Sequence, residues 1–91
     1  MLVNVCPFAT LRETIGKQVI LEMKEGSKVK DVIAELKHRY PEFKQYTNSI
    51  SEGVVAVLVL LNGRDIVHPY EFDIPLREGD EISLFPPLGG G

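Results

Sequence analysis

The stretch SKVKDVIAELKHRYP, residues 27–41, decides the fold. Its apolar side chains recur with the spacing of one face of an α-helix, at Val29, Val32, Ile33, Leu36 and Tyr40. Ser27 occupies the position of a helix N-cap, and Pro41 forces the helix to end. We therefore expect one amphipathic helix whose apolar face needs a second layer to cover it.

Two segments before this helix have the composition of β-strands. Residues 2–7 are rich in strand-forming residues, and residues 18–24 alternate between apolar and polar side chains. They are joined by residues 9–17, in which Gly16 marks a turn. Together they predict an antiparallel hairpin with a wide loop.

Two further strands are expected after the helix. Residues 54–61 are apolar throughout, which predicts a central strand that is buried on both faces or whose second face meets a partner. Residues 81–85 alternate as a last strand, with Ile82 and Leu84 on the core side. The connecting segments are expected to be turns at Asn62-Gly63 and 77–80, an irregular region or short edge strand at 66–76, and a polar region at 42–53 anchored by Phe43, Tyr46 and Ile50.

The order of these elements predicts an α+β roll of the β-grasp (ubiquitin-like) kind. One main helix packs across a mixed sheet, and the first and last strands are parallel neighbours at its centre. The length of 91 residues fits a single domain, 1–91, with a flexible C-terminal tail, 86–91.

The composition excludes several classes of function. A net charge of −3 disfavours nucleic-acid binding, and the longest apolar run, residues 54–61, is too short to span a membrane. Cys6 is the single cysteine, so no intrachain disulfide can form, and the N-terminus lacks the pattern of a signal peptide. We expect a soluble, cytoplasmic protein.

The sequence does not indicate an active site within the domain. It contains no phosphate-binding loop, and Cys6, His38 and His68 lack the spacing of metal ligands. We expect Cys6 to be a small core residue, His38 a solvated helix residue and His68 a loop residue. The domain is thus expected to be non-catalytic alone, without a metal or a bound cofactor.

The tail, LFPPLGGG at residues 84–91, carries the case for a function. A stiff diproline precedes three glycines, whose lack of a Cβ lets the backbone enter a narrow channel. The four residues after Pro87 reach at most about 13–14 Å, enough to place the Gly91 carboxylate in another protein's active site. A frayed terminus is the alternative interpretation.

A carboxylate reacts only after activation, which this chain cannot perform because it has no nucleotide site. An ATP-using partner would convert the Gly91 carboxylate into an acyl-adenylate. A persulfide sulfur would then give a thiocarboxylate, and a lysine amine would give an isopeptide bond.

Five motifs spread over the whole chain share the pattern of one family. They are FATLR (8–12), SKVKDV (27–32), LNGRD (61–65), PLREGDE (75–81) and LFPPLGGG (84–91). In these motifs the chain resembles the ubiquitin-like sulfur carriers, above all the family of molybdopterin synthase small subunits (MoaD type). The motif at 75–81 and the diproline tail together are specific, whereas a terminal Gly-Gly alone would not be.

The resemblance implies roles for the tail residues. Gly89 is the small residue before the diglycine Gly90-Gly91, and Gly91 is the residue that is adenylated and becomes a thiocarboxylate. If Gly91 were removed first, Gly90 would be the reactive end. Docking to partners would use the exposed face of the sheet near the tail, through Phe8, Phe85, Pro86, Pro87, Leu88 and Gly89. For Phe8 and Phe85 the alternative is core packing or a turn anchor.

The resemblance also implies partners. These are a large molybdopterin synthase subunit that binds the pterin precursor, an ATP-using adenylating enzyme related to the ubiquitin-activating enzymes, and a sulfur donor. Two sulfur transfers would build the dithiolene that binds molybdenum or tungsten.

Three alternatives remain open at this point. The chain could carry sulfur for thiamine, cysteine or tRNA thiolation, although thiazole carriers tend to lack much of residues 42–53. It could be a small protein modifier that is joined to lysines, as some archaeal members of this family are. It could also be an interaction module whose tail has no role.

Overall fold

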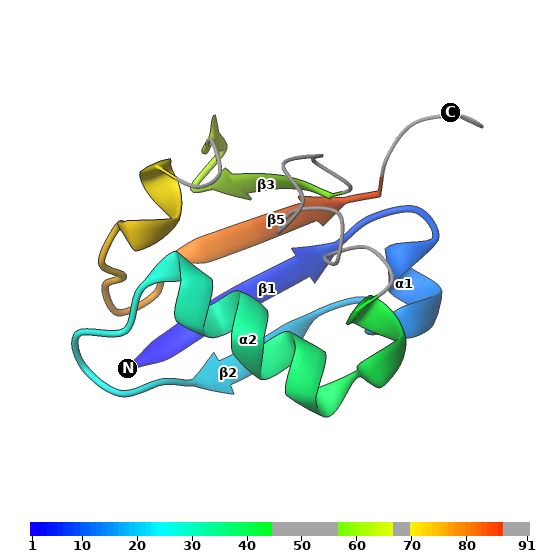
Figure 1. Ribbon diagram of the computed structural model, residues 1–91, viewed down its shortest axis with the longest axis horizontal. Coiled ribbons are helices and arrows are strands. Elements are labelled where there is room, and N and C mark those ends of the chain that lie inside the picture. The colour runs from blue at the N-terminus through cyan, green and yellow to red at the C-terminus, as the bar shows by residue number, and fades with distance from the viewer. Residues whose placement is uncertain (45–56, 67–69, 87–91) are drawn as a thin grey trace.

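The computed structural model describes residues 1–44, 57–66 and 70–86 (Figure 1). Its helices and strands, in chain order, are β1 (Leu2–Pro7), α1 (Leu11–Thr14), β2 (Val19–Glu22), α2 (Val29–Arg39), the 3₁₀ helix η1 (Pro41–Phe43), β3 (Leu58–Leu61), β4 (Arg64–Asp65), the 3₁₀ helix η2 (Tyr70–Asp73) and β5 (Glu81–Phe85).

The strands form one mixed sheet in the order β2-β1-β5-β3-β4. β1 and β5 are parallel, with Val5 opposite Ile82, whereas the other neighbouring strands are antiparallel. The prediction that the first and last strands are parallel neighbours is confirmed, and both arrowheads point to the end of the molecule where α1 lies (Figure 1). The carboxyl ends of β1 and β5 therefore meet at one edge.

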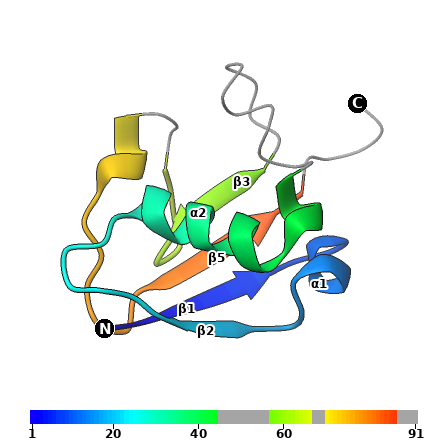
Figure 2. The ribbon, with the colours of Figure 1, turned by 60° about the horizontal axis from the view of Figure 1, so that its bottom comes forward.

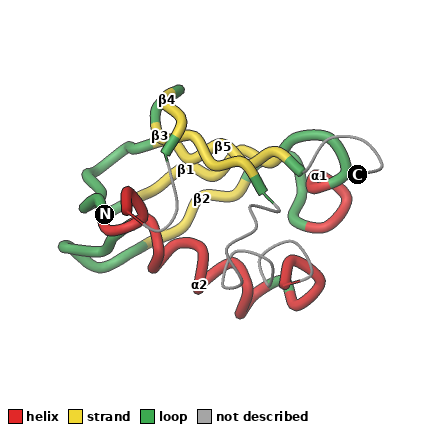
Figure 3. The backbone as a smooth tube through the Cα atoms, turned by 45° about the horizontal axis from the view of Figure 1, so that its top comes forward, coloured by secondary structure: helices red, strands yellow, loops and turns green. Residues whose placement is uncertain are grey.

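Helix α2 lies across one face of the sheet, as predicted (Figure 2). The other helical segments contact α2 or one another, so the described helices gather on this side (Figure 3). The opposite face, which we call the outer face, is open to solvent over the described residues and exposes the large apolar side chains of Leu2, Ile20 and Leu58.

The core lies between α2 and the sheet because alternate strand residues point toward the helix. The predicted helix face is buried at Val29, Val32, Ile33 and Leu36, and Tyr40 packs against its edge. From the strands the core receives Val3, Val5, Leu21, Val59, Leu61, Ile82 and Leu84. The predicted anchor Phe43 is fully buried, whereas Tyr46 and Ile50 lie outside the described residues.

The ends of α2 follow from one local and one distant cause. The helix ends at Arg39 before Pro41, as predicted. Ser27 is not the N-cap, so that prediction was wrong. Lys28 is the N-cap, its N–H donates to Asp31 Oδ2 at 2.8 Å, and the Val29 N–H donates to the Ile74 carbonyl at 3.1 Å.

The expected hairpin of β1 and β2 is present, and its wide loop contains the short helix α1. The Asn62-Gly63 turn is also present, with φ values of 52° and 84°, the signs that a type I′ turn requires. β4 follows this turn directly, earlier than the short edge strand expected within 66–76, and η2 occupies part of that region. The expected turn at 77–80 is present, with Gly79 at φ 82°.

One burial prediction was wrong, and one of the two alternatives given for residues 54–61 is excluded over their described part. Cys6 is half-buried on the outer face, because Val3 and Val5 on the same strand take the inner positions. The strand from the 54–61 segment is not buried on both faces over its described part, because Leu58 is 42% exposed while Val59 and Leu61 are buried. Residues 54–56 lie outside the described residues.

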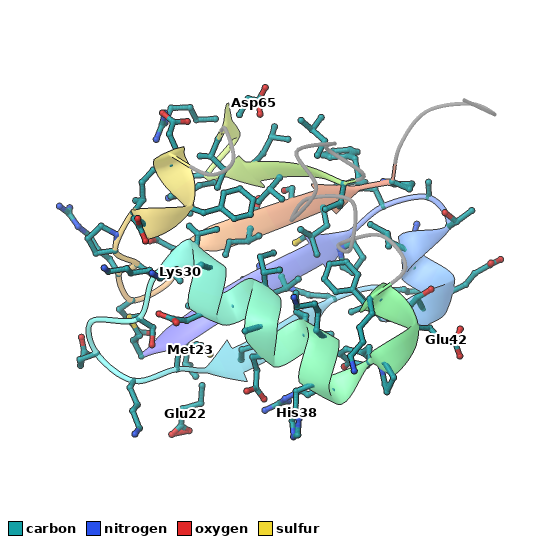
Figure 4. All side chains as sticks on the ribbon, viewed as in Figure 1. Glu22, Met23, Lys30, His38, Glu42 and Asp65 are labelled. Carbon is teal, nitrogen blue, oxygen red and sulfur yellow. The ribbon has the colours of Figure 1, made fainter. Side chains whose placement is uncertain are left out.

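His38 is exposed, as predicted, and its side chain points away from the strands (Figure 4). His68 lies outside the described residues. In the part of the chain that the structure describes, no helix has the length and apolar content needed to cross a membrane.

Candidate functional site

The carboxyl ends of β1 and β5 bring two aromatic residues together. Phe8 directly follows β1, and Phe85 is the last residue of β5. Their rings are nearly parallel, with centroids 4.3 Å apart and an interplanar angle of 7°. The Phe8 N–H donates to the Leu84 carbonyl at 2.9 Å, and this bond links the main chain of Phe8 to the residue that precedes Phe85.

Leu58 extends this ring pair across the outer face. It lies opposite Phe85 in the register of β3 and β5, so the order across the sheet is Phe8, Phe85, Leu58. Phe8 is 40% exposed and Leu58 42% exposed. These three residues, named the outer-face patch here, adjoin Pro86, the last residue that the structure describes. An apolar patch that remains exposed on a folded domain is suited to docking a protein partner.

The next row of the outer face contains Cys6 opposite Ser83. Partial burial raises the pKa of the Cys6 thiol above its ordinary value, and the charge and hydrogen bonding of Glu81 raise this pKa further. The thiol is therefore protonated at neutral pH, and only the thiolate is a good nucleophile or metal ligand. This environment does not activate Cys6 as a thiolate.

The far end of the outer face is acidic. Glu22, Glu78 and Glu81 are exposed there, and the Leu2 N–H donates to Glu78 Oε1 at 2.9 Å. Figure 4 shows Glu22 pointing away from β2. The exposed acidic side chains of the outer face thus gather at the amino end of β5, around the exposed Leu2, whereas the outer-face patch lies at its carboxyl end.

The structure places three of the eight predicted site residues. Phe8 and Phe85 lie together on the outer face, and Pro86 is half-buried beside them. Pro87, Leu88, Gly89, Gly90 and Gly91 lie outside the described residues. Leu58 was not among the predicted site residues. Strict alternation within 54–61 would have placed its side chain on the sheet face that points away from the core.

No metal site is evident among the described residues. No group of three or more His, Cys, Asp or Glu side chains in this part of the chain could hold a metal ion. An open pocket of about 330 Å³ lies at the opposite end of β5 from the outer-face patch, lined by Leu61, Asn62, Ile74, Pro75, Arg77 and Asp80.

Two polar side chains of that pocket, Asn62 and Asp80, bind one another and the neighbouring main chain. Asn62 Nδ2 donates to Asp80 Oδ1 at 3.0 Å, Asn62 Oδ1 accepts the Glu81 N–H, and Asp80 Oδ2 accepts the Arg77 N–H. These bonds hold two turns together, so the pocket's carboxylate and amide already have partners within the fold.

Comparison with known proteins identifies relatives over the full length of the fold. The model of the ThiS family matches residues 7–91. Small archaeal modifier protein 3 of Haloferax volcanii is 35% identical over 85 residues, which are 92% of each chain. The molybdopterin synthase sulfur carrier subunit of Dictyostelium discoideum is 33% identical over 87 residues, covering 92% of this chain and 90% of that one.

A solved structure agrees with these sequence matches. A Pyrococcus furiosus protein assigned to subunit 1 of molybdopterin converting factor is 30% identical, with a TM-score of 0.78 over 97% of this chain and 99% of that one. The β-grasp architecture predicted from the sequence is therefore confirmed. The family match, the relatives and the fold together show that the chain belongs to the ThiS family of ubiquitin-like sulfur carriers.

Proposed function

We propose that this protein is the sulfur carrier subunit of a molybdopterin synthase and that the Gly91 carboxylate is its reacting group. The observation that carries the proposal is the outer-face patch, which lies beside Pro86, where the chain continues toward the glycine tail. Membership of the ThiS family and the relatives named as molybdopterin synthase sulfur carrier subunits support it.

The chemistry begins with an ATP-using adenylating enzyme. The Gly91 carboxylate attacks the α-phosphate of ATP, pyrophosphate leaves, and an acyl-adenylate forms. A persulfide sulfur of the donor then attacks the acyl carbon and displaces AMP. A thiol cleaves the resulting acyl disulfide, is itself oxidised to a disulfide, and leaves the thiocarboxylate on Gly91.

The carrier's own residues bind and present the tail. The exposed outer-face patch, Phe8, Phe85 and Leu58, docks the adenylating enzyme and then the large synthase subunit. Gly89, Gly90 and Gly91 offer the narrow backbone that a covered active site requires. The large subunit holds the pterin precursor, and two successive carriers deliver its dithiolene sulfurs.

The test is intact mass spectrometry after incubation with ATP, the adenylating enzyme and a persulfide donor. We expect a mass increase that corresponds to exchange of one oxygen for sulfur, absent from a chain lacking Gly91 and unchanged by Lys37→Ala on α2. No adenylate and no thiocarboxylate with an enzyme that activates another carrier would overturn the proposal.

Conjugation to lysines is the second candidate, favoured by the relative named as a small archaeal modifier protein. It predicts that tryptic digests of cell extract contain lysines of other proteins bearing the Gly91 end through an isopeptide bond. Sulfur transfer for thiamine or tRNA thiolation is distinguished from molybdopterin synthesis by supplying the thiocarboxylated carrier to the acceptor enzyme of each pathway and measuring which enzyme receives sulfur.

A further inference from the structure

The Phe8–Phe85 ring pair joins the β1 and β5 sides of the sheet at their carboxyl ends. Pro7 lies opposite Leu84 in the parallel register, and the Phe8 N–H donates to the Leu84 carbonyl. Phe85 has a strand partner on the β3 side, Leu58, and on the β1 side it has the ring of Phe8. The stack therefore holds Phe85, the last residue of β5, on the side that faces β1.

Phe8 is itself held in place by a backbone conformation that costs energy. Ala9 has a φ of 52°, a left-handed conformation that non-glycine residues avoid. The Leu11 N–H donates to the Phe8 carbonyl at 3.1 Å, and Leu11 is fully buried. Strained residues of this kind persist where their surroundings fix them and cluster at functional sites.

The ring pair is not part of the hydrophobic core. Neither Phe8 nor Phe85 belongs to the buried cluster between the sheet and α2, and Phe8 is 40% exposed. A strained, hydrogen-bonded turn thus places an exposed ring against the residue that precedes Pro86. Burial in the core does not account for this arrangement.

We propose that Phe8 is a positioning residue: by stacking on Phe85 it fixes the direction in which the chain leaves the sheet, so that the carboxylate meets the adenylating site in reactive geometry. This inference rests on the proposed function. It assigns Phe8 a role in the rate of the step within the complex, beyond the docking that an exposed apolar residue supplies.

The test compares Phe8→Ala with Leu58→Ala, a matched control of similar exposure on the other side of Phe85 that contributes no ring. Carrier-dependent ATP–pyrophosphate exchange is measured with the adenylating enzyme over a range of carrier concentrations, giving kcat and KM separately. Phe8→Tyr keeps the ring, and Phe8→Leu keeps an apolar side chain without it.

Misplacement of a reacting group by about 1 Å can cost on the order of a hundredfold in rate. We expect Phe8→Ala and Phe8→Leu to lower kcat by about tenfold or more, Phe8→Tyr to retain the wild-type kcat within about twofold, and Leu58→Ala to raise KM with kcat unchanged. Thermal unfolding of each variant checks that the fold is retained.

Two results would overturn the inference in distinguishable ways. If the wild type supports exchange and Phe8→Ala keeps kcat within about twofold, Phe8 does not position the tail, whatever happens to KM. If the wild type supports no exchange with an enzyme that activates another carrier, the proposed function itself fails and the positioning role fails with it.

Discussion

At the scale of single residues, the turn before β5 depends on the conformation of Gly79. Its φ is 82°, and a Cβ built there meets nothing within 4 Å, so a substitution is opposed by the backbone alone. We predict that Gly79→Ala lowers the free energy of unfolding by about 1–2 kcal/mol, measured by urea denaturation. A neutral result would mean that the turn adopts another conformation.

Ala9 offers the reverse substitution as a control. It is an alanine at a φ of 52°, so Ala9→Gly relieves the left-handed conformation while giving the unfolded chain more freedom. We expect the free energy of unfolding to stay constant or rise by up to about 1 kcal/mol. A fall in the free energy of unfolding similar to that of Gly79→Ala would show that the Ala9 methyl group makes stabilising contacts, although Ala9 is exposed.

Residue positions were predictable from the sequence where a local pattern decides them. The buried face of α2 and the inward positions Ile82 and Leu84 follow from helix and strand periodicity. Cys6 was misplaced because its apolar character was given more weight than its parity with Val3 and Val5. Ser27 was misplaced because the Val29 N–H is satisfied by Ile74, a distant residue that no local pattern reveals.

At the scale of elements, the start of α2 depends on Asp31. Its carboxylate accepts the Lys28 N–H at 2.8 Å and lies in the first turn, where the helix dipole favours negative charge. We predict that Asp31→Ala lowers the free energy of unfolding by about 1 kcal/mol in chemical denaturation. Glu35→Ala, which removes only an exposed pair with Arg39, should cost a few tenths of a kcal/mol at roughly neutral pH. Equal losses would contradict a capping role.

An exposed ion pair joins α2 to η2. Lys30 Nζ lies 2.9 Å from Asp73 Oδ1; their hydrogen bond and charges lower the pKa of Asp73 and raise the pKa of Lys30. A lowered carboxyl pKa stabilises the fold at neutral pH, and this contribution is lost as the pH falls through the folded-state pKa, below the ordinary 3.8. The raised lysine pKa adds a contribution that is lost only as the pH rises above 10.5.

We therefore predict that Asp73→Asn lowers the unfolding temperature slightly at pH 7 and not at a pH below the folded-state pKa of Asp73. Added salt should shrink the difference at pH 7, because both side chains are exposed. Unfolding curves of both proteins at several pH values provide the measurement. A difference that persists in strong acid would assign the effect to packing of η2.

Elements were predictable to the extent that they are long enough to carry a pattern. The 11 residues of α2 are enough to show the periodicity of a helix. β4 has only two residues, and it forms because the Asn62-Gly63 turn returns the chain beside β3. The four-residue helix α1 was likewise not expected within the loop. Short helices and strands depend on turns and tertiary contacts, which are difficult to predict from a single sequence.

At the scale of the whole molecule, stability and the proposed reaction are separated. Every residue of the described core precedes Pro86. We predict that a chain lacking Gly90 and Gly91 unfolds within about 2–4 °C of the wild type, since surface changes rarely exceed about 0.5 kcal/mol. The same chain should give no thiocarboxylate. A large drop in unfolding temperature would show that the tail contributes to the fold.

The candidate site was predictable only in part. The family resemblance indicated Phe8 and Phe85 as docking residues near the tail, and the parallel pairing of β1 and β5 explains why both lie at one edge of the sheet. Their stacking and the place of Leu58 beside them depend on strand register, which the sequence does not state. The gathering of acidic side chains at one end of the outer face likewise emerges only when the strands are aligned.

The position of β5 has a consequence for how the molecule assembles. β5 lies between β1 and β3, and its pairing with β1 joins residues as distant as Asn4 and Glu81. Pairing between residues so far apart in the sequence is slow to form, because a long loop must close first. Until it forms, β1 and β3 have no common partner and Phe85 has no ring to stack on. If Phe8 sets the direction of the chain as proposed, that direction would exist only in a fully folded protein, and an activating enzyme that docks on the outer face would discriminate against incompletely folded carriers.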